Sequence, residues 1–348
     1  MSFAGRLYRG ETTIDFISQR KRWFTFSAAL LAISIVSLIF IGLDGSVDFT
    51  GGTIVEAENV AGADISQVRD ALAEIGQDGA RVQLTGGGTI LVQTESLDAA
   101  GQDQLVATVA TIGGVLPDAT NVDAVGPTFG AEITRRAIEA LVIFLIVVAL
   151  FISWRFEWKM ALAALVALFH DLVITSGVYS VVGFEVTPAT VIAILTILGY
   201  SLYDTVVVFD KITENVNDLG NRNTFSEIAN LSMNQVLMRS INTSLTTLLP
   251  IGSLLFVGSY LLGATTLREF ALALFIGVAA GTYSSIFVAT PVLALWKEKE
   301  PEWERMQRRT LRRVGGDLPV AAILADAAQE QVDIGAVARP PRQRRKRR

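Results

Sequence analysis

Six long runs of apolar residues divide the chain, and polar segments separate them. The hydrocarbon core of a bilayer is about 30 Å thick, and an α-helix crosses it in about 20 residues. Because backbone polar groups in lipid must bond within their own segment, such runs favour helices. The pattern therefore predicts a polytopic α-helical membrane protein with six transmembrane helices, at residues 24–42, 137–153, 158–182, 188–209, 241–260 and 269–296.

The first run does not have the form of a cleavable signal peptide. It is longer than the apolar region of a signal peptide, which has about 7–15 residues. No small-x-small cleavage site ends it, and Arg20, Lys21 and Arg22 precede it. Positive charge before a first membrane helix favours a cytoplasmic start. We therefore expect residues 1–23 to form a cytoplasmic N-terminus and residues 24–42 to form the first membrane helix.

A long segment, residues 43–135, follows the first helix and has an alternation of its own. Strand-like alternation and helical spacing of apolar residues follow one another along it. We expect strands at 53–58, 81–84, 89–93 and 121–125 and helices at 64–75 and 98–112, with Asp64 as an N-cap and the glycines at 86–88 in a hairpin turn. This β-α-β-β-α-β order is typical of a ferredoxin-like unit. The segment is therefore predicted to be an α+β ferredoxin-like domain between helices one and two.

Basic residues indicate how the chain is oriented. Lysine and arginine gather before the first run, between the second and third, between the fourth and fifth, and after the sixth. Residues 43–132 hold many acids but only Arg69 and Arg81 as basic residues. Because short loops rich in lysine and arginine stay in the cytoplasm, we expect both termini inside and the 43–135 domain outside. Residues 136–296 then hold helices two to six of a multi-pass protein of the cell inner (cytoplasmic) membrane.

The chain turns polar after the sixth run, over residues 297–348, and ends in an arginine-rich stretch at 342–348. Such a composition cannot bury enough apolar surface to fold. We expect a cytoplasmic, disordered basic tail. Its charge serves either solubility and orientation, or binding of anionic lipid or RNA.

Composition excludes several classes of site. The chain has no cysteine and one histidine, His170, so a disulfide, a cysteine-zinc site and a multi-histidine metal site are excluded. The glycines at 86–88 are not followed by Lys-Ser/Thr, and no Gly-x-Ser-x-Gly motif occurs. We therefore expect no enzyme activity, no catalytic residue, no bound metal and no cofactor.

Ionisable residues inside the apolar runs are the informative ones, since each costs at least about 2.5–3.5 kcal/mol to insert. His170 and Asp171 fall near the middle of the third helix, and Asp204 falls nearer the cytoplasmic end of the fourth. Arg239 lies just before the predicted fifth helix, at a similar depth to Asp204. The Asp204 and Arg239 pair is either a boundary ion pair or part of an ion path. For His170 and Asp171, packing between helices is an equal alternative.

Small hydroxyl residues are frequent in the last two runs. Packing between helices is the default interpretation of such residues, and of the glycines at 277 and 281. Hydroxyls beside a carboxylate can also hold water for proton movement. Pro250 with Gly252 permits a kink in helix five.

Several separate motifs resemble one known family. These are VDFTGGT at 47–53, GPTFGAE at 126–132, the His-Asp pair at 170–171, LTILGYSLYDTVVVFDK at 195–211, NTSLTT at 242–247 and GTYSSIFVA at 281–289. Together they resemble SecF, a family of protein-export membrane subunits within the SecD/SecF group and the RND-type superfamily. The resemblance spans about residues 47–291. One departure is Tyr203, where many relatives have asparagine; the carboxylate of Asp204 stays in place, but the resemblance does not give its hydrogen-bond partner.

The resemblance implies a function and a set of residues. The family's fold is half of an RND-type transporter core, and SecF pairs with SecD in a complex that accompanies the Sec translocase. Further partners implied are the SecYEG channel, SecA, a YidC-type insertase and the translocating unfolded polypeptide in the lipid bilayer, with no nucleic acid. The implied role is to use the proton motive force to promote protein translocation across the cytoplasmic membrane after the ATP-driven step.

By the same resemblance, Asp204 and Arg239 form the proton path. Supporting residues would be His170, Asp171, Tyr203, Thr205, Thr243, Thr247 and Thr282. The family motifs supply Asp48, Phe49, Gly51, Gly52, Gly126, Pro127 and Gly130.

Two other functions compete with this one. Half of an RND-like exporter of small molecules or lipids would have a similar core, but such exporters carry two six-helix halves and a larger external domain. A non-transporting membrane protein with a ligand-binding external domain would not need Asp204 inside the membrane. The sequence leaves open proton against sodium coupling, the stoichiometry with SecD and what the external domain contacts.

Overall fold

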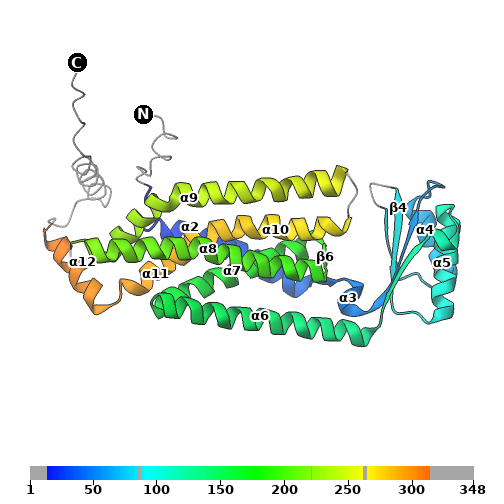
Figure 1. Ribbon diagram of the computed structural model, residues 1–348, viewed down its shortest axis with the longest axis horizontal. Coiled ribbons are helices and arrows are strands. Elements are labelled where there is room, and N and C mark those ends of the chain that lie inside the picture. The colour runs from blue at the N-terminus through cyan, green and yellow to red at the C-terminus, as the bar shows by residue number, and fades with distance from the viewer. Residues whose placement is uncertain (1–13, 85–87, 221, 262–264, 314–348) are drawn as a thin grey trace, which may run out of the picture.

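The computed structural model describes residues 14–84, 88–220, 222–261 and 265–313 (Figure 1). A long bundle of helices carries a small α+β domain at one end, which we call the domain end. The first described residues and the last described helix lie at the other end, which we call the termini end.

Within these described ranges, six helices are long and apolar enough to cross a membrane, as predicted. They are α2 (Arg20–Phe40), α6 (Pro127–Arg155), α7 (Trp158–Val182), α8 (Pro188–Leu219), α9 (Phe225–Ser253) with a π-helical extension η2 (Leu254–Leu261), and α10 (Thr265–Ser284), which continues through the π-helix η3 (Ser285–Ala289) into α11 (Thr290–Lys297). The third helix has the predicted bounds.

The predicted start of helix five is wrong. The helix begins at Phe225 rather than at 241, so Arg239 lies inside α9 and not before it. The reason is that the polar residues Asn230, Ser232 and Asn234 are buried with partners instead of facing solvent. Similarly, α8 continues past the predicted end at 209 to Leu219. Both helices are therefore longer at the termini end than a bilayer requires.

Pro250 lies inside α9 without ending it. Proline removes one backbone hydrogen bond and crowds the preceding turn. The helix widens into η2 just after this residue, and π-helical turns often occur where the regular ladder is disturbed. The sequence permitted a kink at Pro250 and Gly252, and the structure shows a π-helical segment that begins at Leu254.

The segment between α2 and α6 contains each of the predicted strands and helices. They are β2 (Gly52–Glu58), α4 (Ile65–Glu74), β3 (Arg81–Leu84), β4 (Thr89–Thr94), α5 (Ala99–Gly113), a short 3₁₀ turn η1 (Pro117–Ala119) and β5 (Asn121–Val125). The sheet has the order β3-β4-β2-β5, and all neighbouring strands are antiparallel. Asp64 caps α4 through a capping box with Gln67, as predicted for the cap. Residues 85–87, in the predicted hairpin turn, lie outside the described residues.

Alternation along the strands places the core of this domain on one face of the sheet. Val55, Ile90 and Val92 are fully buried against Val68 of α4 and Leu105 of α5. The opposite face carries the intervening positions, which include polar residues such as Glu56 and Gln93.

Two short elements that the sequence did not predict join the domain to the bundle. The strand β1 (Asp44–Gly45) pairs in parallel with β6 (Glu185–Val186), which lies between α7 and α8. The four-residue helix α3 (Val47–Thr50) packs on α6. These elements have only two to four residues each, which is too short for a periodic pattern of apolar residues to predict them.

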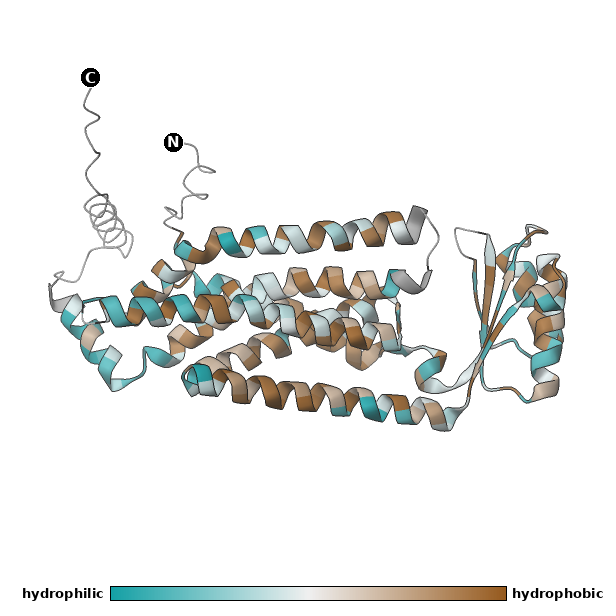
Figure 2. Ribbon diagram, viewed as in Figure 1, coloured by the Kyte–Doolittle hydropathy of each residue, from teal (hydrophilic) through white to brown (hydrophobic). Residues whose placement is uncertain are grey.

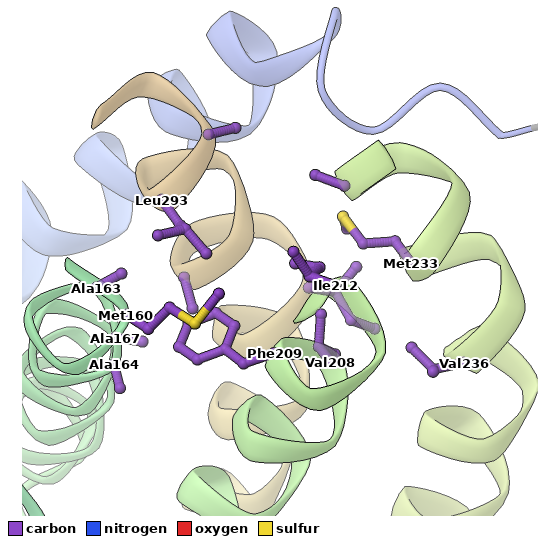
Figure 3. Close-up of a cluster of buried hydrophobic side chains, with 14 of the residues drawn as sticks. Met160, Ala163, Ala164, Ala167, Val208, Phe209, Ile212, Met233, Val236 and Leu293 are labelled. Atoms are coloured by element: carbon purple, nitrogen blue, oxygen red, sulfur yellow. The ribbon is translucent and has the colours of Figure 1, made fainter. Parts of the chain in front are cut away.

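The main core of the bundle lies near the termini end (Figure 3). Ala163, Ala164 and Ala167 give α7 a face of small side chains, against which larger ones such as Phe209 of α8 pack. By contrast, α6 is brown along much of its length in Figure 2 and has large exposed apolar side chains, including Ile143 and Leu150. An apolar outer surface of this kind suits contact with lipid.

A further helix, α12 (Pro301–Arg313), lies at the termini end, where the sequence predicted a disordered tail from 297. That prediction is wrong for these residues. Trp303 is buried and packs edge-on against Phe225 of α9, with ring centroids 5.2 Å apart. One aromatic anchor gives this otherwise polar helix a packing partner. The arginine-rich stretch at 342–348 lies outside the described residues.

Candidate functional site

Asp204 lies on α8 inside the bundle and is only 4% exposed. Ser240 Oγ, from α9, donates a hydrogen bond of 2.8 Å to Asp204 Oδ1. The other carboxylate oxygen, Oδ2, is buried, and no described residue forms a hydrogen bond with it. An ionised carboxylate with an unpaired oxygen is costly in an apolar interior. The neutral, protonated carboxyl therefore suits this arrangement.

Arg239 does not pair with Asp204 in this structure. Its Nη2 donates a hydrogen bond of 2.8 Å to the hydroxyl of Tyr203, and its guanidinium lies 5.8 Å from the Tyr203 ring centroid. No ion pair among the described residues joins Arg239 to Asp204. The expected direct pair is thus not seen among the described residues, and Arg239 binds Tyr203 instead.

Asp171 of α7 is the centre of a second polar cluster and is 1% exposed. Ser201 Oγ of α8 and Ser284 Oγ of α10 donate to its Oδ2 at 2.7 and 2.8 Å. His170 Nδ1 lies 3.2 Å from its Oδ1. The His170 ring stacks on Tyr283 with ring centroids 6.0 Å apart, and its buried Nε2 has no hydrogen-bond partner within the part of the chain that the structure describes. Asp171 therefore links three membrane helices.

The predicted supporting threonines divide into two groups. Thr205 Oγ1 lies 2.8 Å from Ser285 Oγ, Thr282 Oγ1 lies 2.7 Å from Ser244 Oγ, and Thr247 donates to the Tyr200 hydroxyl at 3.0 Å. These three connect neighbouring helices. Thr243 does not, since its hydroxyl bonds to backbone carbonyls of its own helix.

A glycine of α10 allows these contacts. A Cβ atom built at Gly281 would lie 2.8 Å from Ser201 Cβ. With glycine there, α8 and α10 approach closely enough for Ser201 and Ser284 to reach the same carboxylate. The predicted role of this glycine in close helix packing is consistent with that geometry.

Sequence reasoning missed Ser201 and Ser240 as partners of the two carboxylates. Ser201 lies one helical turn before Asp204, a spacing that places both residues on one side of α8. That spacing was a usable signal. Ser240 had none, because its contact with Asp204 depends on the rotation of α9 about its axis.

The glycine-rich family motifs lie elsewhere, where the domain meets the bundle. A Cβ at Gly51 would lie 2.8 Å from Pro127 Cα, and one at Gly130 would lie 2.5 Å from Phe49 O. Gly126 and Pro127 start α6. Two motifs distant in sequence thus meet at one close backbone contact.

Asp48 and Gly52 complete this junction. Ser46 Oγ donates to Asp48 Oδ2 at 3.1 Å. Gly52 has φ of +155°, and a Cβ there would lie 2.5 Å from Thr94 O. The structure therefore places these motif residues in a junction rather than beside Asp204.

Six apolar helices among the described residues, with the carboxylates of Asp171 and Asp204 buried between them, define a polytopic membrane protein with ionisable groups in its core. The family described as protein export membrane protein SecD/SecF, C-terminal, matches residues 105–299. The chain belongs to this SecD/SecF family.

Relatives extend the similarity beyond the matched region. Protein translocase subunit SecF of Streptomyces coelicolor is 42% identical, covering 96% of this chain and 89% of its own length. Protein translocase subunit SecDF of Thermus thermophilus is 36% identical over 81% of this chain but only 38% of its own length. A crystal structure of Thermus SecDF superposes with a TM-score of 0.75 at 33% identity, covering 83% of this chain and 39% of that one. The chain is therefore similar to whole SecF subunits and to a part of SecDF.

Proposed function

We propose that this SecF-type translocase subunit works with SecD to promote protein translocation across the cytoplasmic membrane, driven by the proton motive force after the ATP-driven step. The observation that carries the proposal is the buried Asp204 carboxylate, with one oxygen bound by Ser240 and the other free to hold a proton. Buried ionisable groups in membrane helices commonly serve ion or proton paths.

Arg239 gives Asp204 a second state. In the present arrangement Arg239 is bound to Tyr203. If the guanidinium left the Tyr203 hydroxyl and reached Asp204, it would neutralise the ionised carboxylate. Moving one charge across the membrane field is worth about 2.3 kcal/mol per 100 mV, which is enough to bias such an equilibrium. Asp171 and His170 lie on the domain side of Asp204 and would support this path through Ser201.

The outer surface around Arg239 supports a membrane partner. Tyr203 is 50% exposed, and Arg239, Asn242 and Thr246 are also exposed on α9 at helical spacing. Polar groups of this kind are costly against lipid, so a second helical protein should cover them. SecD is the partner we propose, since SecDF of Thermus is a single chain that this chain matches over 38% of its length. The SecYEG channel, SecA and a YidC-type insertase would join the assembly.

The proposed topology places the α+β domain outside the membrane and both termini in the cytoplasm. The lysine and arginine asymmetry supports this orientation. The sheet order β3-β4-β2-β5 with two helices on one face supports a ferredoxin-like domain. The six-helix bundle would be half of an RND-type core. The external domain would then meet the emerging unfolded polypeptide.

The test is secretion in cells that carry Asp204→Asn as their single copy. Asparagine keeps the shape and the Ser240 contact but cannot carry the proton. Asp210→Asn is the matched control, because Asp210 lies on the same helix, is exposed and pairs with Arg155 at 3.1 Å. We expect unprocessed secretory precursor to accumulate with Asp204→Asn and not with Asp210→Asn, while SecD co-purifies with both. Normal secretion with Asp204→Asn would refute the proton role.

A further inference from the structure

Polar side chains from one edge of the sheet connect the α+β domain to the bundle. Arg81 of β3 pairs with Asp44 of β1 and lies 3.0 Å from Glu185 Oε1 of β6. Gln93 of β4 donates a hydrogen bond of 3.0 Å to Glu185 Oε2. Arg81 and Gln93 are paired neighbours in the sheet, so they lie on the same face. That face is opposite the one that α4 and α5 cover.

Glu185 is the residue that the bundle contributes to this contact. It is only 7% exposed, and it lies in the short connection between α7 and α8. Those two helices carry Asp171 and Asp204. A buried carboxylate needs charged or hydrogen-bonding partners, and both partners of Glu185 described here come from the α+β domain. The connection between the two carboxylate-bearing helices therefore depends on the position of the domain.

Two glycines join α3 to the domain next to this contact. Gly51 has φ of +78° and Gly52 has φ of +155°, backbone conformations that favour glycine, at the point where α3 leads into β2. A cleft of about 600 Å³ lies beside the contact and is lined by Asp44, Arg81 and Gln93, among others. The domain thus has a glycine junction and open space next to the polar contact.

We propose that Arg81, Gln93 and Glu185 form a releasable latch that sets the orientation of the α+β domain relative to the bundle. When the latch is closed, the domain is held against the α7–α8 connection. When α7 and α8 shift, Glu185 moves, the contact opens and the domain turns about Gly51 and Gly52. The latch itself is independent of whether protons drive the shift, so it stands apart from the proposed function.

Distances between two spin labels on the full chain in lipid nanodiscs test the latch. The natural chain has no cysteine, so Gln104→Cys on α5 and Val182→Cys at the domain end of α7 give unique labelling sites, both exposed. We expect one narrow distance population in the labelled parent. Arg81→Gln and Glu185→Gln should each add a second, broader population, and the double variant should look like either single one.

Two control variants make the test decisive. Arg69→Gln removes the other basic residue of the domain, which is exposed on α4, and should leave the distances unchanged. Arg81→Lys keeps the charge and should retain the narrow population if Arg81→Gln loses it. The latch is overturned if Arg81→Gln leaves the distribution as in the parent. It is equally overturned if Arg69→Gln broadens it as much, because the loosening would then not depend on Glu185.

Discussion

Ser201 donates a hydrogen bond of 2.7 Å to Asp171, and one turn further along the same helix lies Asp204. The two buried carboxylates are therefore connected through one face of α8. Ser284 of α10 reaches the same Asp171 oxygen as Ser201. This links α7, α8 and α10, so the position of Asp204 depends on how these three helices pack.

Removing the two serine donors should destabilise this packing. We expect Ser201→Ala and Ser284→Ala each to lower the free energy of unfolding by about 1–3 kcal/mol, because each leaves a buried carboxylate with one donor fewer. The loss of unfolding free energy in the double variant should differ from the sum of the two single losses, since both serines donate to the same oxygen of Asp171. Thermal unfolding in nanodiscs measures this. Thr243→Ala is the control, because its hydroxyl bonds only within its own helix; an equal loss there would contradict the account.

Gly281 should not tolerate even a methyl group. A Cβ there would lie 2.8 Å from Ser201 Cβ, so α8 and α10 must separate. We expect Gly281→Ala to lower stability by about 1–3 kcal/mol, the usual cost of overpacking. Gly199 on α8 has no atom within 4 Å of such a Cβ. Gly199→Ala should therefore be neutral, or stabilising by up to about 1 kcal/mol through helix propensity. An equal change of melting temperature in both variants would show that the close approach of α8 and α10 at Gly281 does not cause the loss of stability.

The two glycines of the GPTFGAE motif should behave differently. Gly130 lies against the backbone of Phe49, where a Cβ would come within 2.5 Å of the carbonyl oxygen. Gly126 has nothing within 4 Å and has a negative φ. Gly130→Ala should lower stability by about 1–3 kcal/mol, whereas Gly126→Ala should be tolerated. The yield and the thermal stability of the two purified variants measure this. An equal loss of stability in Gly126→Ala and Gly130→Ala would show that the contact between Gly130 and Phe49 is not the cause.

The ion pairs of Glu300 at the termini end should make the free energy of unfolding depend on pH. Burial by itself would raise the pKa of Glu300, but the hydrogen bond from Lys159 and the charge of Lys297 outweigh it and lower the pKa. Lys159 Nζ lies 2.7 Å from Glu300 Oε1, and Lys297 Nζ lies 3.2 Å from Oε2. A carboxyl whose pKa is lowered by folding stabilises the protein at pH values above its unfolded pKa, which is 4.5 for Glu300. This contribution to stability is lost as the pH falls through the folded pKa.

Glu300→Gln should therefore reduce stability at neutral pH by no more than about 1 kcal/mol, since Glu300 is partly exposed and water screens its ion pairs. The difference from the wild type should shrink as pH falls below 4.5. Unfolding curves over a pH series measure this. A difference that stays constant down to pH ~3 would mean that the lysines are not the cause.

Much of the fold could be predicted because its patterns are local. The alternation at 121–125 and the apolar run at 158–182 gave the bounds of β5 and α7 directly. The start of α9 could not be predicted, because Asn230 and Asn234 are polar by type yet buried. Their side-chain oxygens accept from the backbone N–H groups of Phe16 and Ile14, more than 200 positions away in sequence.

The burial of Asp204, Asp171 and His170 could be predicted from their place in the apolar runs, whereas their contacts could not. Counting residues along each predicted helix placed Asp204 and Arg239 at a similar depth in the membrane, because depth depends only on the rise per residue. Which of them touch depends on helix rotation and side-chain direction. In the structure those factors bring Ser240 to Asp204 and Tyr203 to Arg239.

The most direct test of the central claim is the gradient dependence of translocation in inverted membrane vesicles containing the intact complex. The rate at which a preprotein completes translocation is measured with and without an imposed proton gradient, for the wild type, Asp204→Asn and Asp210→Asn. We expect the gradient to accelerate translocation by the wild type and by Asp210→Asn alike, and to leave the rate with Asp204→Asn unchanged. Acceleration of Asp204→Asn to the same degree as the wild type would contradict it, and the buried carboxylate would then be a structural group alone.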